Sequence, residues 1–114
     1  MSDAAQSWLD SLAGDGFCLA CALRPPGQVA VQRAWDPQVS AESLEYATRA
    51  VMDLFRVLRL HRLPSHYLQW TFEHGVLHCL RRDDDWLFIV VARRDPPLPE
   101  AHLAAWAQGF MALE

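Results

Sequence analysis

Residues 40–61, SAESLEYATRAVMDLFRVLRLH, predict one long amphipathic helix, and the predicted fold is built around this element. Ser40 can cap its first turn, and apolar residues recur along one face at helical spacing: Leu44, Ala47, Val51, Leu54, Phe55 and Leu58. A second apolar flank borders this face and contains Tyr46, Ala50, Val57 and Leu60. The apolar arc is therefore about 180° wide, whereas one packed face needs roughly 100°. We expect this helix to keep apolar surface after it has packed on its own sheet.

Two runs typical of strands precede this helix, and three follow it. Residues 17–23 and 28–35 are joined by Pro25-Pro26-Gly27-Gln28, which suits a type II turn. Residues 66–73 and 76–81 are joined by His74-Gly75, and residues 86–92 form a continuous apolar run, as expected of a strand covered on both faces. Residues 3–13 and a segment with Pro99 in its first turn predict two terminal helices.

The order helix, two strands, helix, three strands, helix predicts an α/β (α+β) fold. We expect a five-stranded antiparallel sheet, with the long helix on one face and the two terminal helices on the other. The length of 114 residues fits a single domain over residues 1–114.

Composition excludes several classes of function. The net charge of −4 argues against a nucleic-acid surface, which needs a dense basic stripe. The N-terminus lacks the features of a signal peptide, and the apolar run 86–92 is much shorter than the roughly 20 residues of a membrane helix. Three cysteines without a secretion signal indicate free thiols. We expect a cytoplasmic protein that binds no nucleic acid and does not insert into a membrane. All ten basic residues are arginine, a bias that suggests a GC-rich bacterial genome.

The residues that resemble metal or redox sites have poor spacing. Cys18-Leu-Ala-Cys21 has C-x-x-C spacing but lies in a predicted strand, where residues three apart point to opposite faces, so we expect two buried thiols. His74 lies at a turn, and His78 and Cys79 are neighbours on opposite strand faces, which argues against a zinc site.

Catalytic motifs are missing from the sequence. Asp83, Asp84 and Asp85 lack the alternating ligands and glycine of a calcium loop, so a solvated turn is the simpler interpretation. There is no phosphate loop, no G-x-S-x-G and no paired catalytic carboxylate. We therefore expect a non-enzymatic protein with no catalytic residue, no metal site and no cofactor. Most of the five tryptophans should be core residues, but Trp35 and Trp70 could instead anchor a partner.

The order of these elements resembles the roadblock / dynein-light-chain family. It is carried by WLDSLAGDGFCLACAL and QVAVQRAW before the long helix, and by a three-strand meander that ends WLFIVVAR after it. The resemblance covers nearly the whole chain. It departs from the family pattern between the first two strands, where Pro-Pro-Gly replaces the usual Asp-Gly turn.

The resemblance implies a homodimer, or a heterodimer with a paralogous roadblock-like subunit. The central helices would pack side by side, and the sheets would join through the third strand, residues 66–73. The implied dimer interface consists of Tyr46, Ala50, Val57, Leu60, Tyr67, Gln69 and Thr71. Bacterial members often accompany small Ras-like GTPases, so the resemblance also implies a scaffold or regulator of such a GTPase.

Two other functions remain open at this stage. Type III secretion chaperones are also small, acidic and dimeric, but they have three strands before the long helix and two after it. The order predicted for this chain favours the roadblock interpretation. The third hypothesis, from a different class, is a small-ligand sensor or enzyme with a cleft beside Trp35, Cys18 and Cys21.

Overall fold

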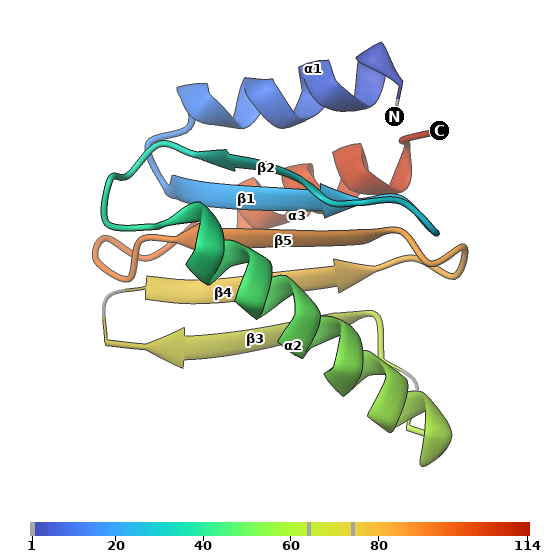
Figure 1. Cartoon of the computed structure of the whole chain (residues 1–114). Helices are drawn as coiled ribbons and strands as arrows, with labels where there is room; N and C mark the ends of the chain where they lie inside the picture. The colour runs from blue at the N-terminus through green and yellow to red at the C-terminus, as the bar shows by residue number, and fades with distance from the viewer. Residues whose placement is uncertain (1, 64, 74) are drawn as a thin grey trace.

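The computed structural model describes residues 2–63, 65–73 and 75–114, and in these ranges five strands form one antiparallel sheet. The elements in chain order are α1 (Asp3–Ser11), a 3-10 turn (Leu12–Gly14), β1 (Cys18–Arg24), β2 (Val31–Ala34), α2 (Ala41–Leu60), β3 (Tyr67–Phe72), β4 (Gly75–Arg81), β5 (Leu87–Ala92) and α3 (Glu100–Met111). The strand order is β2-β1-β5-β4-β3, with α2 on one face and α1 and α3 on the other (Figure 1). The predicted α+β fold is confirmed.

Helix α2 begins and packs as its sequence predicts. The Ser40 side chain caps the first turn, because its Oγ accepts a hydrogen bond from the backbone N–H of Ser43 at 3.0 Å. Leu44, Val51 and Phe55 are buried against the sheet. Thr48 is buried on the same face, and its hydroxyl donates to the carbonyl of Leu44 at 2.8 Å. One face of the helix is therefore buried against the sheet.

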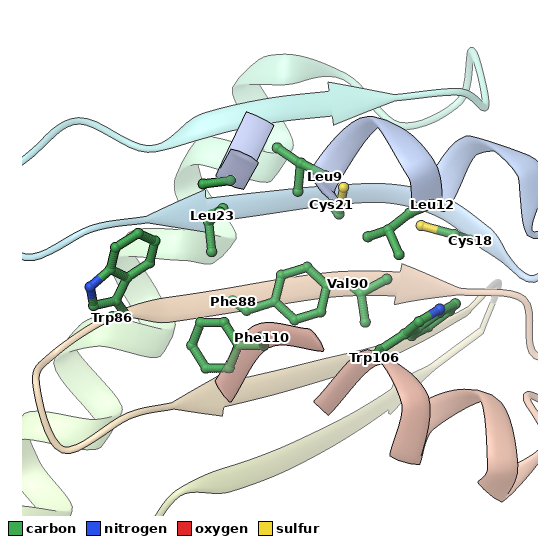
Figure 2. Packing of buried hydrophobic residues seen from close by; sticks show 11 residues of the cluster. Leu9, Leu12, Cys18, Cys21, Leu23, Trp86, Phe88, Val90, Trp106 and Phe110 are labelled. Atoms are coloured by element: carbon green, nitrogen blue, oxygen red, sulfur yellow. The ribbon is translucent and has the colours of Figure 1, made fainter. Parts of the chain in front are cut away.

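Strand β5 separates two hydrophobic cores. All six of its residues are buried. Leu87, Ile89 and Val91 pack in the core under α2. Phe88 and Val90 point the other way, into the core under α1 and α3, where the Phe88 ring lies 5.7 Å from that of Phe110 (Figure 2). The prediction of a central strand covered on both faces is confirmed.

Several element boundaries differ from the prediction. The turn at Pro25-Pro26-Gly27-Gln28 forms, because Gln28 N–H donates to the Pro25 carbonyl at 3.2 Å and Gly27 has a φ of 69°. Pairing of β1 with β2 starts only at Leu23 and Val31, so the predicted strand over residues 28–35 shortens to Val31–Ala34. Pro99 is the N-cap of α3 and lies before its first turn. His74 of the predicted His74-Gly75 turn lies outside the described residues.

The prediction that Cys18 and Cys21 face opposite sides of the sheet is wrong. Both belong to the core under α1 and α3 (Figure 2). The cause is a one-residue shift in the pairing of β1 with β5 between Cys18 and Ala20, which resets the side-chain alternation.

Candidate docking surface on α2 and β3

Strand β3 is an outer strand whose free edge can be identified residue by residue. It pairs with β4 in a register that places Tyr67 opposite Leu80 and Gln69 opposite His78. Just before the strand, the Arg81 N–H donates to the His66 carbonyl at 2.9 Å. His66 and Arg81 are therefore a hydrogen-bonded pair of facing residues. Hydrogen-bonded and non-hydrogen-bonded pairs alternate in an antiparallel ladder. The backbone groups of Tyr67, Gln69 and Thr71 therefore point away from β4.

This edge lacks the devices that usually prevent edge-to-edge pairing. The sequence of β3, YLQWTF, contains neither a charge nor a proline, and its register with β4 is continuous. The other outer strand, β2, has four residues and carries Arg33, which pairs with Asp10 of α1 at 2.7 Å. Natural sheets protect their edges with short strands, charges, prolines or bulges. Of the two edges, β3 is the one left open to another strand.

The second apolar flank of α2 is exposed, as the width of its apolar arc predicts. Tyr46 is 78% exposed and Leu60 is 75% exposed, and Ala50 and Val57 are also exposed. The spacing of these residues places them above one another along the helix. They lie opposite the face that packs on the sheet, and α2 reaches past β3 at its C-terminal end in the view of Figure 1.

Large side chains of β3 continue this apolar surface. Leu68 packs in the core under α2, so Trp70 and Phe72 lie on the same face of the sheet as the helix. Trp70 is 58% exposed and Phe72 is 43% exposed. Ala47 of α2 and Phe72 line one cavity of about 800 Å³, which shows that the Ala47 side of the helix turns toward the end of β3. By helical spacing, Leu54 and Leu58 lie on that side as well.

The structure exposes all seven predicted interface residues but divides them between two faces, and it separates the two candidate tryptophans. Tyr67, Gln69 and Thr71 alternate with Leu68, so their side chains lie on the face of the sheet away from α2. Tyr46, Ala50, Val57, Leu60, Tyr67, Gln69 and Thr71 all belong to α2 or β3 and are exposed. Trp70 lies on the same strand, whereas Trp35 follows β2 at the opposite edge of the sheet. Phe72 was missed by the sequence analysis, although it lies two residues after Trp70 and so shares its face.

The Tyr67 side chain is held in place by hydrogen bonds to Gln69 and to His78 of β4. The Tyr67 hydroxyl donates to Gln69 Oε1 at 3.0 Å and lies 2.7 Å from Nδ1 of His78 on β4. His78 is buried, and this burial lowers its pKa below the ordinary value of 6.5. Burial raises the pKa of Tyr67, with a smaller contribution from Cys79. Both groups are therefore neutral at pH 7, so the hydrogen-bonded pair holds no net charge.

The three cysteines offer no accessible nucleophile. Cys18, Cys21 and Cys79 are free and buried. Hydrogen bonding to Cys18, together with burial, raises the pKa of the Cys21 thiol, and burial raises that of Cys79 to about 12. The thiols of Cys21 and Cys79 therefore stay protonated at neutral pH. A ligand in a cleft beside Cys18 and Cys21 would have to displace packed side chains of α1 and α3.

In the described ranges, no group of three or more His, Cys, Asp or Glu side chains is placed to hold a metal ion. No helix in the described part of the chain combines the length and the hydropathy that a bilayer span requires. Comparison with protein-family models and with curated proteins found no significant match.

The neutral state of His78 predicts a pH-dependent stability. A histidine whose pKa is lowered in the folded chain takes up a proton more readily when unfolded. Its contribution is fully present above the ordinary value of 6.5 and is lost as the pH falls below it. The free energy of unfolding, measured with urea, should decrease between pH 7.5 and pH 5.5. His78→Gln should flatten this slope, whereas His61→Gln, at the exposed C-cap of α2, should leave it in place. An equal slope in wild type and His78→Gln would contradict the assignment.

Proposed function

We propose that the chain is a non-enzymatic scaffold or regulator that works as a dimer through the α2–β3 surface. The observation that carries this proposal is the open edge of β3 beside the exposed apolar flank of α2. Each feature alone favours association, because an unpaired edge seeks another strand and contiguous apolar surface is favourable to bury. Both features on one side of the molecule support one interface that uses both.

The edge fits a second copy of itself. A twofold axis through Gln69 would place Gln69 opposite Gln69 of the second copy, and Tyr67 opposite Thr71 of the second copy. In this antiparallel register, every free backbone N–H and C=O of the three residues meets a partner. A self-complementary patch is what a twofold-symmetric dimer requires. The two sheets would then continue as one.

The same axis brings the two α2 helices together. They lie on the same face of the joined sheet, run in opposite directions, and turn toward each other the sides that carry Ala47, Leu54 and Leu58, with the exposed flanks at the outer margin of this contact. Trp70 and Phe72 face this space from the sheet below. Burial of apolar area contributes about 25 cal/mol per Å², and a typical stable interface buries about 800 Å² from each partner. The aromatic side chains supply large contact areas, which is why such residues dominate interface energies.

We further propose, from the resemblance to the roadblock family, that the dimer binds a small Ras-like GTPase. A paralogous subunit with a similar β3 edge would form the same interface as a second copy. The order of two strands before α2 and three after it differs from that of type III secretion chaperones, so the chaperone remains the weaker alternative.

The apolar flank is tested by Tyr46→Asp/Val57→Asp. The two charges would lie on the exposed flank, where the second helix is proposed to make contact, and an unpaired carboxylate is costly to bury there. Multi-angle light scattering should give twice the chain mass of 13.0 kDa for the wild type and the single mass for the variant. Gln28→Asp/Ala104→Asp adds the same two charges at exposed positions elsewhere and should remain a dimer. A variant that stays dimeric, or a monomeric wild type, would refute the helix contact.

The open edge is tested separately by Gln69→Pro. Proline removes the outward N–H of residue 69 but no hydrogen bond to β4, so the fold should persist while the dimer weakens. Each backbone hydrogen bond lost at the interface costs about 1 kcal/mol, and the ring also obstructs the second strand. Trp70→Pro is the matched control, because it removes a bond inside the β3–β4 ladder and should destabilise the monomer itself. Equal dimer affinity in wild type and Gln69→Pro would exclude strand pairing.

The proposed partner class is tested by the genes that adjoin the gene for this chain. A small Ras-like GTPase encoded there should co-elute with the dimer in size-exclusion chromatography, with its affinity depending on the bound nucleotide. A neighbouring secretion cluster, or a GTPase that elutes separately in both nucleotide states, would count against this part of the proposal.

A further inference from the structure

A second surface lies on the other flank of α2, away from β3. A pocket of about 350 Å³ forms there between α2, the β1–β2 turn and the β4–β5 turn. Its lining includes four arginines that are far apart in the sequence: Arg24, Arg56, Arg59 and Arg81. Asp85 is the only carboxylate among its lining residues, so the lining carries a charge of +3 in a chain of net charge −4.

Asp85 forms ion pairs with two of these arginines, Arg59 and Arg81. Its Oδ1 lies 3.0 Å from Nη2 of Arg59 and 3.5 Å from Nη1 of Arg81. The Arg81 side chain is 11% exposed, and its guanidinium lies 5.9 Å from the centre of the Phe55 ring. Arg59 is also in the last turn of α2, where a cation offsets the helix dipole. These two side chains are therefore held in place within the fold.

The guanidinium groups of Arg24 and Arg56 have few partners within the fold. The Arg24 guanidinium makes no hydrogen bond, ion pair or ring contact with any residue in the described ranges, although Arg24 is half-buried. Arg56 pairs only with the exposed Asp53, at 2.9 Å. An arginine has five N–H donors arranged as a planar fork. Most of these donors remain available at the pocket.

The wall beside Arg24 is rigid. The next four residues form the hydrogen-bonded turn that ends at Gln28, in which Gly27 adopts a positive φ. Pro26 and Gly27 of this turn line the pocket together with Met52 and Phe55 of α2. Prolines and a hydrogen-bonded turn leave little backbone freedom to lose, and a pre-organised wall lowers the entropic cost of binding.

We propose that this pocket binds a small ligand that carries two or more phosphoryl groups. The lining carries three excess positive charges, one of which, on Arg56, is also paired with the exposed Asp53, and this arrangement favours an anion of high charge density. Each phosphoryl group carries about −1.5 to −2 charges at pH 7. Arginine forks match phosphate oxygens in bidentate geometry. The site lies on the flank of α2 opposite the one that turns toward β3, so binding and dimer formation are separate properties and this inference does not depend on the proposed dimer.

The test is isothermal titration of the full chain with inorganic pyrophosphate and triphosphate at low ionic strength. Arg24→Gln/Arg56→Gln should weaken both affinities about 100-fold, since one hydrogen bond between charged groups contributes roughly a factor of ten. Arg49→Gln/Arg94→Gln removes the same charge from exposed arginines outside the pocket and should bind like wild type. The monomeric Tyr46→Asp/Val57→Asp variant should also bind like wild type.

Three outcomes would overturn the proposal. They are the absence of binding at millimolar pyrophosphate and triphosphate, equal weakening in the two double variants, and binding of citrate or a polyglutamate peptide as tightly as triphosphate. The last result would show a general polyanion or acidic-peptide surface. Nucleoside diphosphates and triphosphates form a second arm. Binding tighter than that of the inorganic anions would extend the ligand to nucleotides, and equal binding would restrict recognition to the phosphates.

Discussion

Strand β5 lies in the middle of the sheet, and the burial of all six of its residues requires helices on both faces. Helix α2 meets this requirement on one side, and α1 and α3 meet it on the other. Strands β4 and β1 flank β5 in the sheet, so β3 and β2 are the two outermost strands. The single helix on its face cannot cover the whole width of a five-stranded sheet, so the outer strand on the β3 side keeps large apolar side chains exposed.

Helix α2 divides two surfaces of opposite chemistry. The side of α2 that turns toward β3 carries Ala47, Leu54 and Leu58. This apolar side continues into Trp70 and Phe72 of β3. The flank that turns toward the β1–β2 turn carries Arg56 and Arg59 and meets Arg24 and Arg81. A helix with one buried face, one apolar flank and one basic flank can hold a protein on one side and an anion on the other.

Two thiols and one imidazole in the interior serve packing and positioning. The thiols of Cys21 and Cys79 have raised pKa values and lie among apolar side chains, so they behave as packing groups. His78 is neutral and hydrogen-bonded to Tyr67 directly behind the β3 edge, where it supports the position of an edge residue. Among the described residues, the outward backbone groups of β3 and the Arg24 guanidinium are two sets of groups with unused hydrogen-bonding capacity.

Features that depend on local pattern could be predicted from the amino-acid sequence. Ser40 and the helical spacing after it predicted α2 and its exposed flank, the apolar run 86–92 predicted a strand covered on both faces, and Pro25-Pro26-Gly27 predicted its turn. These features follow from capping, side-chain periodicity and turn chemistry, which act over a few residues. The start of β2 was less predictable, because the length of an edge strand depends on where pairing begins.

Which distant residues meet could not be predicted from local pattern, because it depends on how the whole chain packs. A one-residue register shift put Cys18 and Cys21 on one face, although their spacing in a regular strand predicts the opposite. The direction in which α2 crosses the sheet placed Phe72 beside the Ala47 side of the helix. It also placed four arginines around one pocket. Register and crossing direction are set by the packing of whole layers, and no short stretch of sequence contains that information.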